Sequence, residues 1–289
     1  MVIVKLIGGL GNQLFQYAAA RRIAYINNVP LKLDISSFVD YPLRAYKLQP
    51  FNVVQELASP EEVARLKGAG LANRIFRWTQ QILPYHRRAW LVERQFHFDP
   101  AILRASGDVY LEGYWQSEKY FKDIEPIVRA EFTVKTAPDP VNEAMAQTIR
   151  RTQSVSLHIR RGDYVSDATM RHVHGICLLE YYYTAVARLI QAGVTPHFFI
   201  FSDDPPWAQA NLKLKSPVTI VTHNGANRDY EDLRLMSLCH HHIIANSSFS
   251  WWGAWLSQNQ NKIAFAPAKW FNTTERDTRD LIPDEWHRI

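Results

Sequence analysis

Short hydrophobic runs alternate with amphipathic segments over the first forty residues. The β-branched run VIVKLI (2–7) predicts a strand, and VPLKLDI (29–35) predicts the next one. Apolar residues recur at helical spacing between them and predict a helix over about 12–28: Phe15, Ala19, Ile23 and Ile26. We therefore expect this part of the chain to form one β-α-β unit.

From residue 150 onward the same alternation becomes regular. Strands are predicted at SVSLHI (154–159), HFFIFS (197–202), VTIVT (218–222), HIIAN (242–246) and IAFAP (263–267). Helices are predicted between them, at 179–193, 206–213, 228–238 and 248–258. Strands that alternate with helices indicate a doubly wound parallel sheet, whose ligands bind beyond the carboxyl ends of the strands.

Residues 40 to 150 are less regular, with short helical patterns and several prolines. The stretch TVKTAPDP (133–140) is rich in turn residues and poor in apolar ones, so we place a domain boundary there. The expected domains are residues 1–140 and 141–289.

Composition narrows the class of protein. The 289 residues are 47% hydrophobic and 21% charged, which is typical of a globular protein. No apolar run approaches the ~18 residues of a membrane span, and the apolar start MVIVKLIGG is too short for a secretory signal. The two cysteines, Cys177 and Cys239, form no disulfide framework, so a reducing cytoplasm is expected.

The basic balance favours an anionic ligand or surface. The net charge is +5 and the pI is about 9.1, but the basic residues form no long run, so no nucleic-acid partner is expected. One segment intersperses arginines with aromatic and aliphatic residues: Arg74, Arg77, Arg87 and Arg88. It is interpreted as a helix with solvated arginines or, alternatively, as peripheral attachment to the inner membrane.

Polar residues follow three predicted strands of the second half. They are Arg160-Arg161-Gly162-Asp163, Ser202-Asp203-Asp204 and Asn246-Ser247-Ser248. A guanidinium group can donate two parallel hydrogen bonds to the oxygens of one phosphate. A helix N-terminus carries a partial positive charge that also suits phosphate. If the strands are neighbours, these residues predict a site for a nucleoside diphosphate.

Simpler interpretations exist for each signal. The serines could be N-caps, the aspartates before two prolines could form a turn, and Arg161-Gly162-Asp163 could be an adhesion tripeptide. Cys239 and the adjacent His240, His241 and His242 could suggest zinc, but neighbouring strand residues point to opposite faces, so no metal is expected. Trp251, Trp252 and Trp255 have helical spacing and are interpreted as core.

A glycine loop near the N-terminus invites a rival function. Gly9-Leu10-Gly11 nearly opens the fingerprint G-x-G-x-x-G of NAD-linked oxidoreductases, with Asp34 about twenty residues further on. The third glycine of that fingerprint is replaced by Leu14. What remains is a glycine loop that opens a helix and offers backbone N–H groups to a pyrophosphate.

Four motifs occur together in one order: GGLGNQLFQYA, HIRRGDYV, FSDDPPW and IIANSSFSWWGAWL. Their combination, over residues 8 to 256, resembles the glycosyltransferase family 11 fucosyltransferases, the bacterial α-1,2-fucosyltransferase group. The resemblance implies a GT-B fold, with two Rossmann-like α/β domains facing across a cleft. It also implies GDP-fucose as donor, inversion at the fucose anomeric carbon, the 2-hydroxyl of a terminal β-galactose as acceptor, and neither metal nor cofactor.

The resemblance also implies roles for single residues. Arg160 and Arg161 would hold the pyrophosphate, with His158 beside the nucleoside, and Asp204, with Asp203 less directly, would accept hydrogen bonds from guanine. The phosphates would lie at a helix start: Ser247, Ser248 and Phe249. The donor phosphate or fucose would be reached from the first domain, the acceptor side: Gly11, Asn12 and Gln13. Arg160 and Asn12 are the expected catalytic residues.

The acceptor hydroxyl must lose a proton, and the sequence does not identify the base. Asp34 and Asp163 are the two carboxylates considered, and a dissociative reaction path would need little base. A carbohydrate- or nucleotide-binding module without turnover is a further alternative. Arg160, Arg161 and Asn12 are all present, which favours an active enzyme.

Overall fold

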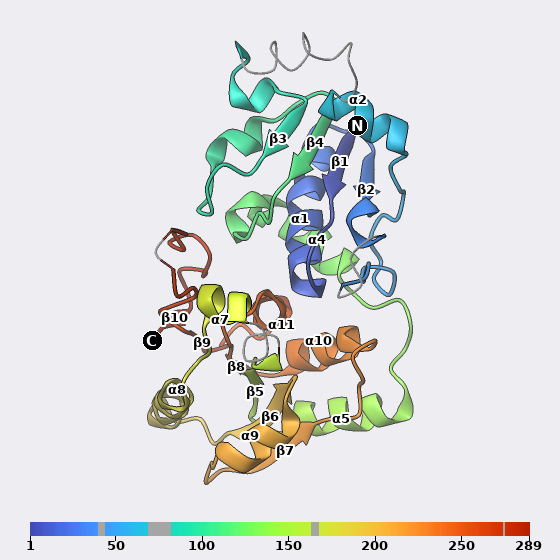
Figure 1. Cartoon of the computed structure of the whole chain (residues 1–289). Coiled ribbons are helices and arrows are strands. Elements are labelled where there is room, and N and C mark those ends of the chain that lie inside the picture. The colour runs from blue at the N-terminus through green and yellow to red at the C-terminus, as the bar shows by residue number, and fades with distance from the viewer. Residues whose placement is uncertain (40–43, 69–81, 163–167, 274) are drawn as a thin grey trace. The chain divides into compact units, whose positions relative to one another are not determined.

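The computed structural model describes residues 1–39, 44–68, 82–162, 168–273 and 275–289 (Figure 1). The chain forms two compact units. Unit 1 comprises Met1–Lys135 and Asp277–Leu281, and unit 2 comprises Thr136–Arg276 and Ile282–Ile289. The chain thus leaves unit 1 within the turn-rich stretch 133–140 and returns to it briefly near the C-terminus.

Unit 1 contains a parallel sheet of four strands in the order β2-β1-β4-β3. The strands are β1 (Val2–Lys5), β2 (Leu31–Asp34), β3 (Trp90–Val92) and β4 (Val109–Glu112). The central strand β1 pairs Val2 with Leu31 on one side and with Val109 on the other. The β-α-β unit expected over the first forty residues is confirmed, whereas β3 and β4 arise from the stretch whose pattern predicted no strand.

Helices of unit 1 pack on this sheet. The long helix α1 (Leu10–Ile26) connects β1 to β2 and buries twelve of its residues, among them Leu14, Phe15 and Ile23. The shorter helices are α2 (Pro60–Lys67) and α4 (Glu125–Glu131). Single 3-10 turns complete the unit: η1 (Ser36–Phe38), η3 (Tyr85–Arg87), η4 (Pro100–Arg104), η5 (Glu118–Tyr120) and η6 (Lys122–Ile124).

Unit 2 contains a parallel sheet of six strands in the order β10-β9-β8-β5-β6-β7. They are β5 (Ser154–Ile159), β6 (His197–Ser202), β7 (Val218–Val221), β8 (His241–Ile243), β9 (Ala264–Ala266) and β10 (His287–Arg288). The five strands that the sequence predicts in this half are confirmed. The short edge strand β10 was not predicted.

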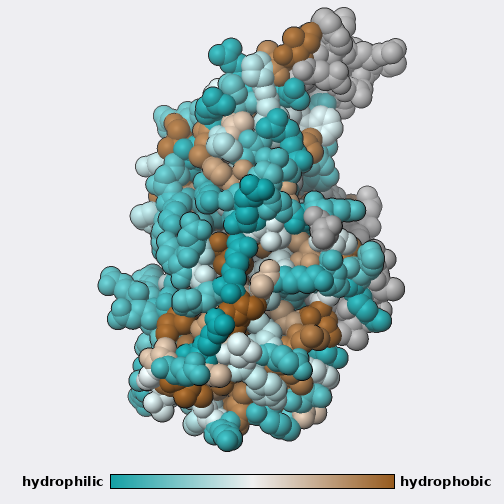
Figure 2. All heavy atoms as spheres, turned by 90° about the vertical axis from the view of Figure 1, so that its left-hand side faces the viewer, coloured by the Kyte–Doolittle hydropathy of each residue, from teal (hydrophilic) through white to brown (hydrophobic). Residues whose placement is uncertain are grey.

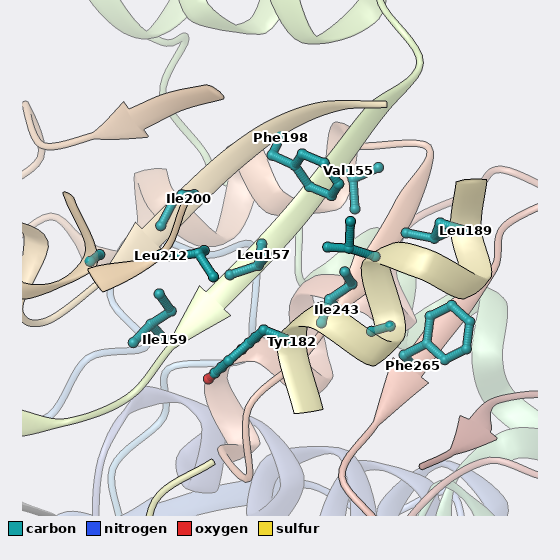
Figure 3. Packing of buried hydrophobic residues seen from close by; sticks show 13 residues of the cluster. Val155, Leu157, Ile159, Tyr182, Leu189, Phe198, Ile200, Leu212, Ile243 and Phe265 are labelled. Atoms are coloured by element: carbon teal, nitrogen blue, oxygen red, sulfur yellow. The ribbon is translucent and has the colours of Figure 1, made fainter. Parts of the chain in front are cut away.

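Both faces of this sheet are covered by helices. These are α5 (Pro140–Arg150), α7 (Ala168–His174), α8 (Leu179–Gln191), α9 (Pro205–Asn211), α10 (Asp229–Leu238) and α11 (Ser248–Leu256). Val155, Leu157 and Ile159 of β5 point toward α8, as Figure 3 shows, while alternate residues of β6 supply the opposite core with α5 and α10. The sheet is therefore doubly wound, and the α/β class expected from the GT-B resemblance is confirmed.

Candidate functional site

Two arginines occupy the loop that follows β5, the strand at the centre of the unit 2 sheet. Nη1 of Arg160 lies 3.0 Å from a carboxylate oxygen of Asp203, which follows the neighbouring strand β6. The backbone N–H of Arg161 donates to the other oxygen of Asp203 over 2.8 Å. The residues that the sequence placed at two separate strand ends are thus in direct contact.

Glycine is required next to this ion pair. A Cβ atom added to Gly162 would lie 2.6 Å from an oxygen of Asp203, which is closer than such atoms approach in proteins. The carboxylate of Asp203 therefore packs directly against the backbone of residue 162. Gly162 allows Asp203 to reach both arginines at once.

The second aspartate has two tasks. Asp204 is the N-cap of α9, because its carboxylate accepts the backbone N–H of Trp207 over 3.2 Å. Its other oxygen lies 3.3 Å from Nε of Arg161, and the guanidinium of that arginine stacks 3.9 Å above the indole ring of Trp207. Asp204 and Trp207 together fix the plane of the Arg161 guanidinium.

His158 lies inside the sheet, two residues before the arginines. Its side chain is buried, and burial together with the charge of Arg160 lowers the pKa of His158 to about 3, so the imidazole is neutral at physiological pH. Its Nδ1 is buried without a hydrogen-bond partner among the described residues. Its ring lies 5.7 Å from the ring of Phe249, measured between centroids, which brings the start of α11 next to the end of β5.

The start of α11 carries the serines of the third motif. Ser247 holds the N-cap position, but its side chain makes no capping hydrogen bond, so a plain N-cap does not explain this residue. Ser248 and Phe249 form the first turn, where the helix presents its positive end. The following tryptophans are buried at 0% to 3% exposure, which confirms their interpretation as core: Trp251, Trp252 and Trp255.

We call residues 158–162, 202–204 and 247–249 the arginine edge. All of them lie at or just beyond the carboxyl ends of β5, β6 and β8, which are neighbours in the sheet. Guanidinium groups held by carboxylates beside a helix N-terminus form an environment suited to a diphosphate.

Unit 1 presents a different chemistry at the corresponding end of its sheet. The loop Gly8-Gly9 leads from β1 into α1, and its neighbours are neutral amides: Asn12, Gln13, Gln16 and Gln116. We call Gly8–Gln16 together with Gln116 the amide edge. Gly11 is buried in the first turn of α1, and Asn12 is half-buried there.

Gln13 and Gln16 bind backbone rather than presenting their amides to solvent. Both are fully buried. Gln13 donates to the carbonyls of Gly8 and Ala45 over 3.0 and 2.9 Å and accepts the N–H of Lys47. These contacts tie the loop at Gly8 to residues 45 and 47, and the contact with the donor that the resemblance implies for Gln13 stays a prediction.

Asp34 is poorly suited to accept a proton. Its carboxylate accepts hydrogen bonds from the Tyr110 hydroxyl (2.6 Å) and from the Ser36 N–H (2.9 Å). Burial alone would raise the pKa of Asp34, but these hydrogen bonds and nearby Lys67 outweigh it and hold the pKa below its usual value. Leu14, where the NAD fingerprint needs its third glycine, is fully buried.

The three consecutive histidines are structural. His240 and His242 lie with Nδ1 at 2.9 and 2.8 Å from the hydroxyls of Ser154 and Ser156, and His241 accepts the N–H of Ile263. Among the residues that the structure describes, no cluster of histidine, cysteine, aspartate or glutamate side chains is placed to hold a metal ion.

Sequence reasoning missed an acidic residue in the first turn of α10. Asp232 accepts a hydrogen bond from Asn224 over 2.9 Å, and burial raises the pKa of Asp232 to about 6, assisted by Asp229 and Glu231. Gln116 and Trp207 were missed as well. Trp207 could have been found from its position three residues after Asp204. A residue at an N-cap and an aromatic residue in the first turn of the same helix lie close together.

Several predicted features fall outside the described residues, namely Asp163, Arg74 and Arg77. Over the described ranges, no helix combines the length and the apolar character needed to cross a membrane. On the face drawn in Figure 2, hydrophobic side chains form separate spots among hydrophilic ones. The interpretation of the arginine-rich segment as a membrane contact stays a prediction.

Comparison with known proteins covers the whole chain. The family model for Glycosyl transferase family 11 matches residues 1–289 of the chain. Alpha-1,2-colitosyltransferase of Escherichia coli is 33% identical, with 100% of this chain and 99% of that protein aligned. The O-antigen biosynthesis glycosyltransferase WbnK of Escherichia coli is 29% identical, with 97% and 98% aligned.

Solved structures support the fold. NodZ alpha-1,6-fucosyltransferase from Bradyrhizobium, co-crystallized with GDP, superposes with a TM-score of 0.50 at 13% identity, over 87% of this chain and 91% of that one. A mutant of Arabidopsis thaliana FUT1 in complex with GDP gives a TM-score of 0.52 at 11% identity, over 98% and 74%. At these identities the likeness concerns the arrangement of strands and helices.

Proposed function

The chain belongs to glycosyltransferase family 11, and from that premise we propose that it transfers L-fucose from GDP-fucose to the 2-hydroxyl of a terminal β-galactose. The transfer inverts the anomeric carbon of fucose and needs no metal ion. Unit 2 binds the donor, and unit 1 is the acceptor side. Family membership leaves the oxidoreductase alternative without support.

The observation that carries the proposal is the geometry of the arginine edge. Arg160 and Arg161 are each paired with a carboxylate, and Arg161 is also stacked on Trp207. Both guanidinium groups are therefore oriented before an anion binds. The start of α11 follows β8, the neighbour of β5 in the sheet, and its Phe249 lies next to His158, two residues before Arg160. A diphosphate is the anionic group that such a set of donors suits best.

Transfer of fucose requires that the departing GDP be stabilised. The bond between the fucose anomeric carbon and the diphosphate oxygen breaks, and its electron pair leaves with GDP. Positive charge grows on the sugar ring while negative charge grows on the diphosphate. Guanidinium groups that are aimed beforehand stabilise that charge without reorganising during the reaction. Arg160 and Arg161 take this role, and His158, Ser247, Ser248 and Phe249 line the donor site.

The acceptor oxygen forms the new bond to the anomeric carbon and releases its proton. Asp34 does not serve as the base, because its carboxylate is engaged by Tyr110 and Ser36 and its pKa is lowered. Asp203 and Asp204 position the arginines, since each carboxylate is paired with one of them, and the contact with guanine that the resemblance implies stays a prediction.

A second donor is favoured by one observation, the 33% identity to a colitosyltransferase over the full chain. Colitose is the 3-deoxy analogue of L-fucose, so a donor site for one differs from a donor site for the other by a single hydroxyl. A site that hydrogen-bonds that hydroxyl would discriminate strongly against colitose, whereas an apolar site would not.

The proposal is tested by incubating the protein with GDP-fucose or GDP-colitose and a panel of acceptors ending in galactose, with EDTA present. We expect GDP release that depends on the acceptor, an α-1,2 linkage in the product, and rates with and without EDTA that agree within about twofold. A nucleotide-binding module would bind GDP without releasing it from the sugar donor. Absence of transfer with every acceptor, or loss of activity on chelation, would contradict the proposal.

A further inference from the structure

The loop that follows β4 in unit 1 has a strained backbone. Trp115 adopts a φ of +55°, a left-handed conformation that is unfavourable for a residue with a side chain. Its indole is fully buried and packs edge-on against Tyr120, with ring centroids 5.6 Å apart. Strain of this kind persists only where the surroundings hold it, and it is often found where a side chain must be aimed.

Two polar side chains hold the loop. The carboxylate of Glu93, one residue past β3, accepts the backbone N–H of Tyr114 with one oxygen and that of Trp115 with the other, over 2.8 and 2.9 Å. Gln16 of α1 donates to the carbonyl of Gly113 over 3.1 Å. Charge-assisted bonds to two successive amides stabilise the turn at Trp115.

The held loop delivers Gln116 to Asn12. Nε2 of Gln116 donates to Oδ1 of Asn12 over 2.8 Å, and the Gln116 side chain is almost entirely buried. This contact joins residues separated by more than one hundred positions in the sequence. Because an amide accepts through oxygen and donates through nitrogen, the contact decides which end of the Asn12 side chain points where.

The other end of the Asn12 amide lies over Gly8. A Cβ atom at Gly8, whose φ is +77°, would lie 2.5 Å from Nδ2 of Asn12. Gly8 thus leaves the volume that Nδ2 occupies, and Gln116 holds Oδ1 on the opposite side. Asn12 is oriented from both ends of its amide.

We propose that Gln116 is a positioning residue for Asn12 and that Glu93 holds Gln116 in place through the strained loop. The inference rests on the proposed function, in which Asn12 acts on the donor or the acceptor sugar. With Oδ1 bound by Gln116, Asn12 meets its substrate through Nδ2, as a hydrogen-bond donor to an oxygen of the donor sugar or diphosphate. Asn12 therefore does not accept the proton of the acceptor hydroxyl.

A double-mutant cycle tests this role. Gln116→Leu keeps most of the side-chain volume and removes the donor, and we expect kcat to fall about ten- to a hundredfold with KM for the GDP-sugar changed by less than about threefold. In the Asn12→Ala background, the same substitution should lower kcat by less than about twofold more. Equal losses in both backgrounds would overturn the inference, because they would show that Gln116 does not act through Asn12.

Gln116→Glu supplies a second, independent variant. It replaces the donor with acceptor oxygens, so the Asn12 amide must turn its nitrogen toward position 116, and we expect kcat to fall at least as far as in Gln116→Leu. If the leucine variant does not fold, the cycle is run with Gln116→Glu, which preserves the shape. A kcat near that of the wild type in Gln116→Glu would overturn the inference.

The matched control is Ser117→Ala, in the same loop. Ser117 is buried and caps η5 by accepting the N–H of Lys119, but no hydrogen bond links its side chain to Asn12. Its loss should lower the melting temperature and leave kcat within about twofold. Transfer by the wild type tests the proposed function separately. If the wild type is active and Asn12→Ala impaired while Gln116→Leu is fully active, only the inference fails.

Discussion

The two units present opposite chemistry at the same structural position. Each has a parallel sheet with functional candidates just past its strand ends, but the arginine edge is built from ion pairs and the amide edge from neutral hydrogen bonds. In unit 2, Arg160 and Arg161 are held by the carboxylates of Asp203 and Asp204. In unit 1, the contact between Asn12 and Gln116 joins two uncharged amides.

The difference follows from what each edge would have to bind. A diphosphate that gains negative charge needs positive charge that is already in place, and carboxylates keep the arginines aimed until it arrives. A sugar is neutral, and orientation matters more there than charge. We therefore expect substitutions at the arginine edge to act through electrostatics, with a dependence on salt, and substitutions at the amide edge to act through geometry.

The largest effect is expected for Arg160→Ala. Removing a donor that stabilises transition-state charge typically lowers kcat by ~10²–10³-fold, and we expect a loss of that size without a loss of fold. Donor KM of the wild type should rise with ionic strength, and this rise should be weaker in Arg160→Ala but unchanged in Asn12→Ala. Initial rates at several salt concentrations measure both quantities.

The matched control is Arg188→Ala, on the exposed side of α8. It removes the same charge from the same unit, but Arg188 lies on a helix that contributes no residue to the arginine edge. Its kcat should stay within about twofold of the wild type. If Arg188→Ala lowered kcat as much as Arg160→Ala, net charge rather than placement would explain the effect.

A stability effect of intermediate size is expected for Asp232→Asn, which converts a charged position of unit 2 into an amide. Burial raises the pKa of Asp232 from 3.8 to about 6, so above pH 6 the folded protein carries a carboxylate that its surroundings disfavour. The substitution should raise the free energy of unfolding by about 1–3 kcal/mol at pH 7.5. Urea unfolding of both proteins measures the difference.

The sign of the pH dependence is specific. As pH rises from 4 to 6, Asp232 ionises in the unfolded chain before it does so in the folded one, so its contribution to stability falls through this window. The variant should therefore equal the wild type near pH 4 and exceed it above pH 6. A stability gain of the same size at both pH values would show that the titration of Asp232 is not the cause.

Unit 2 could be predicted from the sequence far better than unit 1. Its strands are hydrophobic runs separated by helical patterns, because a parallel sheet covered on both faces needs apolar residues throughout. In unit 1, β3 and β4 span only Trp90–Val92 and Val109–Glu112, and the connection between them contains one 3-10 turn, η4, rather than an amphipathic helix. Such short elements leave little periodicity to detect.

The candidate site divides in the same way. Arg160, Arg161, Asp203 and Asp204 could be brought together from the sequence only on the condition that their strands are neighbours, and the pairing of β5 with β6 meets that condition. The contact of Asn12 with Gln116 could not be predicted, since it depends on a left-handed backbone at Trp115 that no local sequence pattern indicates. The backbone contacts of the buried Gln13 could not be predicted either, since they join α1 to residues 45 and 47 of a stretch without a clear pattern.

The smallest effect, and the finest test of the comparison, belongs to Asp203→Asn. The amide can still accept the Arg161 N–H, but it no longer pairs with Arg160, so kcat should fall about tenfold as the guanidinium loses its orientation. Donor KM should fall two- to threefold, since a carboxylate no longer competes with the diphosphate for the same arginine. Partly exposed ion pairs contribute no more than about 1 kcal/mol, so the melting temperature should change little.

If Asp203 instead recognised the guanine base, the substitution would raise donor KM. An increase in KM with kcat unchanged would thus return Asp203 to the role that the sequence resemblance implied, and the arginine edge would then depend on Asp204 and Trp207 alone for its orientation.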